Sequence, residues 1–258
     1  MANPTACILI IGNEVLSGRT RDANIQYLAS ELGQMGIPVR EVRVIPDDPL
    51  TIIGTVNETR RTFTHVFTTG GIGPTHDDIT SECIARAFST PWEPHPVAWQ
   101  RMADFYAGQN PPGEFNAARQ RMATMPRGCV LIENEATIAP GFSMENVHVM
   151  AGVPRIMQAM FQALAPRLQR GEAIVSATVH ADGIFEGGIA EALSAVQDAH
   201  PDLDIGSYPY FRPMPVRGGV ALVAKGTDAV EVAQAADAIE ALLLAAGGQP
   251  VRGEPITD

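Results

Sequence analysis

The chain has 258 residues, of which 45% are apolar, and this content can bury a sizeable core and excludes a disordered tail or a disulfide-stapled miniprotein. Its 18 basic and 29 acidic residues give a net charge of -11, so the basic surface of a general nucleic-acid binder is missing. An anionic ligand would therefore need locally arranged hydrogen-bond donors or a metal ion.

The cysteines and the N-terminus indicate a reducing compartment. Cys7, Cys83 and Cys129 are odd in number and far apart, which favours neither a disulfide framework nor a metal knuckle. The apolar run 7–11 is too short for a signal peptide or for the roughly 20 residues of a membrane helix. We therefore expect a soluble, cytoplasmic protein with no membrane and no nucleic-acid partner.

Short apolar runs alternate with segments of helical periodicity, the pattern of an α/β domain with a largely parallel sheet. In chain order, the sequence predicts a strand at 7–11, a helix at 22–35, a strand at 39–45, a helix from 48 or 49, a strand at 65–69 and a helix from 77 or 78. In the second of these helices, Leu50, Ile53 and Val56 are expected to face inward.

The middle of the chain, 91–126, is rich in proline, methionine and arginine, and we expect helices and loops laid over the core. Strands are predicted at 130–132 and 147–150. A helix then begins at Pro154, and Gly171 is expected to end it.

A domain boundary is predicted at Gly171, because the charge balance changes there from -2 in residues 1–171 to -9 in residues 172–258. The second part predicts a smaller two-layer α/β domain. Its expected elements are a strand at 173–179, a helix at 186–197, strands at 203–207 and 216–224, and a helix at 228–246.

The most informative segment is the glycine-rich run 68–80, between a strand and a helix. Glycines at this position let backbone amides approach an anion closely, and the helix dipole favours negative charge there. The spacing fits neither a dinucleotide-binding loop nor a P-loop. A purely structural turn remains an alternative, because glycine is also the default residue at positive φ.

Two adjacent carboxylates, Asp77 and Asp78, stand beside this predicted phosphate cradle. Helix capping alone could explain one of them, but two would repel a phosphate unless a divalent cation such as Mg²⁺, Mn²⁺ or Co²⁺ bridges them. Glu14 and Asp47 follow two other predicted strands. In a parallel sheet all four carboxylates would emerge at the carboxyl edge, where ligands of open α/β sheets bind.

Weaker candidates lie elsewhere. The segments 139–141 and 152–154 follow strand-like runs and could line the same cleft. Asn116, Arg119 and Arg121 could reach the phosphates or base of a ligand, although a solvated helix face explains them as well.

With these segments in order, the sequence resembles the molybdopterin-binding fold family, the MogA/MoaB-like domain, and within it the domain that opens CinA-like proteins. The segments that carry the resemblance are 12–18, 22–24, 46–48, 69–80, 139–141 and 152–154. The second part, with its Ile-Gly-Ser-Tyr-Pro run at 205–209, is similar to the small α/β domain of CinA-like chains and of eukaryotic FAD synthases.

The resemblance implies a three-layer α/β/α sandwich with a second, smaller α/β domain, in a homo-oligomer. It places Asp78 and Asp47 at the catalytic acidic positions. The CinA-like branch implies divalent-metal-dependent hydrolysis of ADP-ribose or a related dinucleotide. A molybdopterin-binding or adenylylating protein, with molybdopterin as ligand, and a noncatalytic binder of a nucleotide or pterin remain the alternatives.

The predicted site combines these inferences. Asp78, Asp47 and Glu14 are the expected metal ligands, and the expected substrate-binding residues are Gly12, Asn13, Gly70, Gly71, Gly73, Pro74, Thr75, Asp77, Thr80, Pro140, Gly141, Gly152 and Pro154.

Two segments depart from the usual family pattern. The usual Gly-Thr-Ala-Pro-Gly is Ala-Thr-Ile-Ala-Pro-Gly at 136–141, and the usual Leu-Pro-Gly-Val-Pro-x-Glu ends in Ile156 here. The chain also ends before an amidase domain, so nicotinamide-nucleotide deamidase activity is not expected.

Overall fold

The computed structural model describes residues 3–211 and 218–256. They divide into two compact units, Met1–Gly171 and Glu172–Asp258. In the first unit the elements are β1 (Ala6–Ile11), α1 (Asn13–Leu16), α2 (Asn24–Gln34), β2 (Val39–Ile45), α3 (Pro49–Thr62), β3 (His65–Thr69), α4 (Thr80–Ala87), β4 (Trp92–Pro94), α5 (Pro96–Ala107), α6 (Ala117–Arg121), β5 (Thr124–Pro126), β6 (Val130–Ile132), β7 (Gly141–Met144), β8 (Val147–Met150), α7 (Pro154–Leu164) and a 3₁₀ turn, η1 (Ala165–Arg167).

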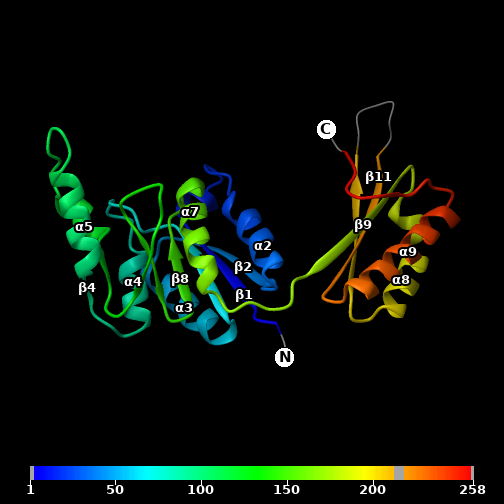
Figure 1. The fold of residues 1–258 in the computed structure, drawn as a ribbon, viewed down its shortest axis with the longest axis horizontal. Helices are drawn as coiled ribbons and strands as arrows, with labels where there is room; N and C mark the ends of the chain where they lie inside the picture. The colour runs from blue at the N-terminus through cyan, green and yellow to red at the C-terminus, as the bar shows by residue number, and fades with distance from the viewer. Residues whose placement is uncertain (1–2, 212–217, 257–258) are drawn as a thin grey trace. The chain divides into compact units, whose positions relative to one another are not determined.

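A six-stranded sheet of order β2-β1-β3-β8-β7-β6 forms the centre of the first unit (Figure 1). The first four strands of this order are parallel to one another, β7 is antiparallel to β8, and β6 is antiparallel to β7. Parallel strands place their carboxyl ends at one edge of the sheet, so the loops after β1, β3 and β8 emerge together.

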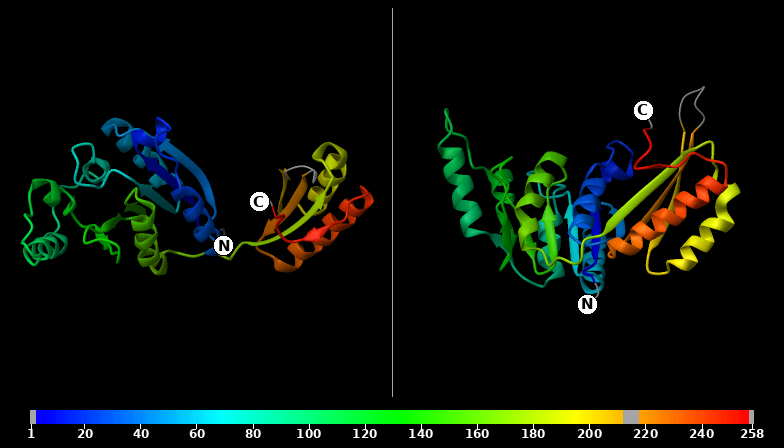
Figure 2. Two further views of the ribbon diagram at one scale, coloured as in Figure 1. Left: turned by 90° about the horizontal axis from the view of Figure 1, so that it is seen from above. Right: turned by 45° about the vertical axis from the view of Figure 1, so that its right-hand side comes forward.

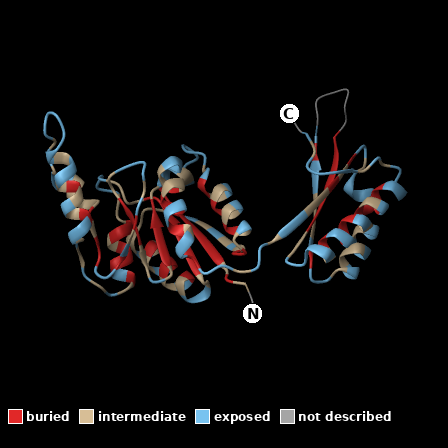
Figure 3. Ribbon diagram, in the orientation of Figure 1, coloured by how far each residue is buried: buried red, intermediate tan, exposed pale blue. Residues whose placement is uncertain are grey.

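The sheet is covered on both faces because its strands are apolar on both. Along β1, Cys7, Leu9 and Ile11 pack with α3 and α4, whereas Ile8 and Ile10 pack with α2 and α7. Alternation along a strand sends successive side chains to opposite faces, and Figure 3 shows these strands buried. The predicted three-layer α/β/α sandwich is confirmed.

Several local predictions need correction. Leu50 is 78% exposed, and Ile52 faces the core instead, whereas Val56 is buried and Ile53 packs against the core as predicted. Helix α4 begins at Thr80 rather than at Asp77 or Asp78. Helix α7 ends at Leu164, before Gly171, because Pro166 cannot continue the α-helical hydrogen bonds.

Other differences concern short strands. Strand β7 was not predicted, and it forms an antiparallel hairpin with β8. The segment 91–126 does contain helices, α5 and α6, together with the ribbon of β4 and β5.

The second unit contains β9 (Val175–Asp182), α8 (Glu186–Ala199), β10 (Asp204–Tyr210), β11 (Gly219–Gly226), α9 (Ala229–Ala245) and β12 (Val251–Arg252). Its antiparallel sheet has the order β10-β11-β9-β12. Both helices pack on one face of this sheet, α9 over β9 and β11 and α8 over β10 (Figure 2). The predicted smaller α/β domain is confirmed, although β12 was not predicted and the start of the strand predicted at 216–224 lies outside the described residues.

Within residues 3–211 and 218–256, no helix is long and apolar enough to cross a bilayer. Cys7, Cys83 and Cys129 are all buried free thiols.

A chain of buried hydrogen bonds crosses the edge of the sheet opposite the carboxyl ends. His65 Nε2 lies 3.3 Å from the Gln169 carbonyl oxygen, His65 Nδ1 lies 3.2 Å from His148 Nε2, and His148 Nδ1 lies 2.9 Å from Ser143 Oγ. A carbonyl oxygen can only accept, so His65 must donate from Nε2. It follows that His148 donates to His65 and Ser143 donates to His148, with both imidazoles neutral.

Acid should destabilise the first unit through this chain. Burial lowers the pKa of His148 to about 3 and also lowers the pKa of His65, whereas unfolded histidine titrates near pH ~6.5. Between these values only the unfolded state binds the proton, so stability falls as pH falls. Urea unfolding should show a loss of up to about 3 kcal/mol from His148 between pH 7 and pH 4.

The matched variant is His148→Gln, whose amide can donate to His65 and accept from Ser143 without titrating. Its stability should depend less on pH than that of the wild type. Equal pH dependence in the two proteins would contradict the role of His148.

Candidate ligand-binding site

Backbone segments from three strand ends meet at Gly70. Its φ is +104°, and a Cβ there would lie 2.1 Å from the Ile11 carbonyl oxygen, so only glycine fits. A Cβ on Gly152 would lie 3.3 Å from Gly70 Cα, and the Gly70 amide donates to the Met150 carbonyl at 3.1 Å. The loops after β1, β3 and β8 are therefore in direct contact.

Asn24, at the start of α2, holds the loops after β3 and β8 together by hydrogen bonds. Its Nδ2 donates to the Gly152 carbonyl at 2.9 Å and to Thr69 Oγ1 at 3.4 Å. The side chain is 3% exposed. The predicted site residues do not include Asn24, although it lies in one of the segments that carry the family resemblance.

A cavity of about 650 Å³ opens beside this junction, a volume typical of small-molecule sites. Of the predicted site residues, the following line it: Glu14, Gly70, Gly71, Gly73, Pro74, Asp78, Pro140, Gly152 and Pro154. The following predicted residues are outside its lining: Gly12, Asn13, Asp47, Thr75, Asp77, Thr80 and Gly141.

Asp78 is held in place by the loop itself. Its Oδ2 accepts a hydrogen bond from the Thr75 amide at 2.8 Å and another from the Thr75 hydroxyl. A Cβ on Gly73 would lie 2.7 Å from Oδ2, so the carboxylate lies directly over Gly73, and a side chain at that position would displace it. Asp78 therefore closes a turn before α4 and presents its carboxylate at the cavity.

Of the other two predicted metal ligands, Glu14 lines the cavity and Asp47 does not. The Glu14 carboxylate lies against Gly12, 2.6 Å from where a Cβ would be, and Glu14 lines the cavity. Asp47 Oδ2 accepts from the Asn13 amide at 2.9 Å, so this carboxylate fixes the start of α1. Within the described parts of the chain, no three His, Cys, Asp or Glu side chains form a group that could hold a metal.

Beneath the glycine loop is a buried hydroxyl. Thr80 Oγ1 is fully buried and has no hydrogen-bond partner among the described residues. A Cβ on Gly71, whose φ is +67°, would lie 2.1 Å from this oxygen. Gly71 thus needs to be glycine for both conformational and steric reasons.

Residues of the α5–α6 region complete the cavity. Tyr106 and Met122 line it, and no sequence signal indicated them because they are far along the chain from every glycine loop. Arg121 Nε donates to the Asp78 carbonyl at 2.9 Å, and the Arg119 guanidinium lies 4.0 Å from the Tyr106 ring centroid. Asn116 caps α6 by accepting from the Arg119 amide. These residues thus support the cavity wall.

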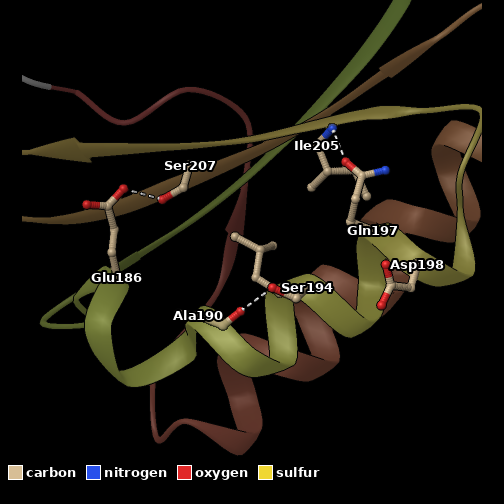
Figure 4. A pocket seen from close by; sticks show the side chains of 8 residues that line it. Glu186, Ala190, Ser194, Gln197, Asp198, Ile205 and Ser207 are labelled. Carbon is tan, nitrogen blue, oxygen red and sulfur yellow. Dashed lines mark hydrogen bonds between the residues drawn. The ribbon is translucent and has the colours of Figure 1, made fainter.

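A second cavity of about 460 Å³ lies between α8 and β10 in the second unit (Figure 4). Its polar groups largely satisfy one another. Ser207 Oγ donates to Glu186, Gln197 Oε1 accepts from the Ile205 amide, and Ser194 Oγ donates to the Ala190 carbonyl. This cavity therefore offers a ligand fewer free groups than the cavity beside the glycine loop.

Comparison with known proteins agrees with the fold. Residues 7–170 match the family described as "Probable molybdopterin binding domain", and residues 174–248 match the middle domain of FAD synthase. The chain belongs to the molybdopterin-binding domain family.

The relatives include CinA-like proteins. An Archaeoglobus fulgidus protein is 34% identical over 92% of this chain and 96% of its own length, and a CinA-like protein of Parasynechococcus marenigrum is 33% identical over 94% of this chain. The latter match spans 59% of that relative's length. A solved structure of CinA from Thermoplasma acidophilum, described as of unknown function, has 28% identity and a TM-score of 0.59 over 65% of this chain and 99% of that one.

The two departures from the usual molybdopterin-binding pattern fall in the cavity. Its lining includes Thr137, Ile138 and Ala139 from the first altered segment and Ala151 and Ile156 from the second. The parts of this chain that differ from the family pattern are therefore placed where a ligand would touch them.

Gly71→Ala should damage the loop more than a matched change elsewhere. Gly18 also has a positive φ, +72°, but a Cβ there meets nothing within 4 Å. Both substitutions carry about 1 to 2 kcal/mol of backbone strain, and only Gly71→Ala adds the collision with Thr80, which costs about 1 to 3 kcal/mol more. Urea unfolding of the two variants measures the difference, and equal losses of stability would show that the loop is loosely packed.

Proposed function

We propose that this CinA-like molybdopterin-binding-domain protein is a divalent-metal-dependent nucleotide pyrophosphatase acting on ADP-ribose or a related dinucleotide. The observation that supports it most is the shared position of Asp78 and the glycine loop. The carboxylate lies directly over Gly73 at one end of a cavity of about 650 Å³, while the rest of the lining is mainly apolar. In this proposal the ligand binds within residues 1–171.

The residues have distinct roles in the proposed hydrolysis. Backbone amides of residues 71–73 bind diphosphate oxygens, on which negative charge develops. The Gly70 amide does not take part, because it donates to the Met150 carbonyl. Asp78, fixed by Thr75 and by Arg121, orients the attacking water. The water oxygen bonds to one phosphorus while the bridging P–O bond breaks, which yields AMP and ribose 5-phosphate from ADP-ribose.

The carboxylates of the cavity fit a divalent ion such as Mg²⁺, Mn²⁺ or Co²⁺. Mg²⁺ is usually held by one or two carboxylates together with substrate phosphate oxygens. Asp78 and Glu14 line the cavity and meet that requirement without a cluster of three protein ligands. When bound, the ion would neutralise the diphosphate and polarise its P–O bonds.

The second candidate function is binding or adenylylation of molybdopterin, and the family match over residues 7–170 favours it. A noncatalytic binder of a nucleotide or pterin would use the same cavity. Hydrolysis of ADP-ribose in the presence of Mg²⁺ or Co²⁺ separates the first proposal from both others. A pterin bound to the purified protein would favour the second.

Asp78→Asn should remove most of the hydrolytic activity while leaving the fold nearly intact. Asparagine can still accept from the Thr75 amide but lacks the charge that a metal or a water requires, so stability should change by less than about 1 kcal/mol. Asp47→Asn is the matched control, since Asp47 contacts Asn13 outside the cavity lining. The steady-state hydrolysis rates of the two variants are compared at saturating metal. Wild-type turnover in Asp78→Asn would exclude a catalytic role for Asp78.

Ligand binding should require the divalent ion. Two unit charges about 4 Å apart interact by about 4 kcal/mol at an effective dielectric of 20, whereas a helix dipole stabilises an anion by only about 0.3 to 2 kcal/mol. The repulsion from Asp78 and Glu14 should therefore dominate without metal. Calorimetric titration with ADP-ribose should show weak or no binding in EDTA and clear binding with Mg²⁺, Mn²⁺ or Co²⁺. Equal affinities in the two buffers would exclude the metal site.

A further inference from the structure

The lining of the cavity has two chemically different parts. We call Glu14, Asp78 and the backbone of the glycine run 70–73 the polar end. The remaining wall is built mainly by the apolar side chains of Ile72, Met122, Ile138, Ala139, Val153, Ile156 and Met160. We call this set the apolar wall.

The polar groups beside the apolar wall are largely engaged by the protein itself. Thr137 donates its amide to Asn134 Oδ1 at 2.7 Å and its hydroxyl to the Ala139 carbonyl at 3.2 Å. The same carbonyl also accepts from Asn134 Nδ2 at 2.9 Å. These groups are therefore already hydrogen-bonded within the protein when no ligand is bound.

Two backbone groups of the segment 151–153, which also contributes to the apolar wall, are engaged within the protein as well. The Ala151 amide points to Met160 Sδ at 3.4 Å, and the Gly152 carbonyl accepts from Asn24. Tyr106 lines the cavity next to this wall, and no described residue forms a hydrogen bond with its hydroxyl. That hydroxyl is the side-chain group left beside the wall that could contact a polar edge. The lining contains a second hydroxyl with no partner among the described residues, that of Thr20, but Thr20 lies beside Glu14, to whose carbonyl its amide donates at 3.0 Å.

We propose that the apolar wall binds the base of a nucleotide by packing alone, without reading the hydrogen-bonding edge of the base. The site would then accept purine nucleotides that differ in that edge, such as adenine, hypoxanthine and guanine. The choice of nucleotides as ligands rests on the proposed function, whereas the lack of base discrimination follows from the wall.

Recognition by hydrogen bonding and recognition by apolar packing differ in how strongly they discriminate between similar ligands. A site that hydrogen-bonds a substrate group rejects an analogue without it by about 10⁴- to 10⁵-fold, whereas an apolar pocket discriminates by only about 10- to 200-fold. Changing adenine to hypoxanthine replaces a donor amino group with an acceptor oxygen. The affinities for AMP, IMP and GMP should nevertheless agree within about tenfold.

The experiment has a binding arm and a hydrolysis arm. Dissociation constants for AMP, IMP and GMP are measured by calorimetry with Mn²⁺, and kcat/KM is measured for ADP-ribose, IDP-ribose and GDP-ribose. Similar binding without hydrolysis would reject the proposed pyrophosphatase and support the present inference. A preference above about tenfold for one nucleotide in affinity or for one substrate in kcat/KM, or no binding of any of the three nucleotides, would overturn the inference.

Two variants test the wall directly. Ile156→Ala should weaken the binding of all three nucleotides by a common factor of about tenfold, because it removes packing rather than a specific hydrogen bond. Tyr106→Phe should leave the ratios among AMP, IMP and GMP unchanged within about threefold. A change in those ratios in either variant would show that the wall reads the base, and melting curves confirm that both variants are folded.

Discussion

The close backbone contact at Gly70 is the constraint on which the rest of the site depends. The loops after β1, β3 and β8 can meet only because the chain has no side chain at Gly70, where a Cβ would lie 2.1 Å from the Ile11 carbonyl oxygen. The four parallel strands bring these loops to one edge, and glycine lets them touch. The cavity forms beside that junction, and both the Asp78 turn and the apolar wall line it.

The charges of this chain make the local arrangement decisive. With a net charge of -11, the protein as a whole repels anions, so a diphosphate depends on backbone amides and on a counter-ion at the cavity. The structure separates carboxylates that the sequence grouped together. Asp78 and Glu14 line the cavity, whereas Asp47 and Asp48 serve as hydrogen-bond acceptors that fix the starts of α1 and α3.

The sequence predicted the layered fold and much of the polar end of the cavity because both depend on local patterns. Apolar runs with helical or strand spacing located most of the elements, and the glycine run 70–73 marked the backbone junction. The start of α3 was predicted correctly, but apolar spacing alone did not show that Ile52 rather than Leu50 occupies the buried face of this helix. The residue pattern alone did not separate Asp77 from Asp78, and only the family resemblance singled out Asp78. In the structure the Thr75 turn holds the Asp78 carboxylate at the cavity.

The apolar end of the cavity was predicted only in part. The segments 139–141 and 152–154 were expected to line the cleft, but no local pattern showed that the neighbouring Ile138 and Ile156 face it too. Tyr106 and Met122 reach the site only through the packing of the α5–α6 region, and the sequence around them has weak periodicity. Contacts of this kind depend on tertiary structure, which single-sequence patterns do not encode.

The most direct test of this account is a crystal structure of the protein with ADP-ribose and Mn²⁺, in which anomalous scattering locates the metal. The account predicts a metal peak within coordination distance of the Asp78 carboxylate and of the diphosphate, with the base against Ile138 and Ile156. A nucleotide bound in the groove between α8 and β10, or one bound at the glycine loop with no metal near Asp78, would contradict it.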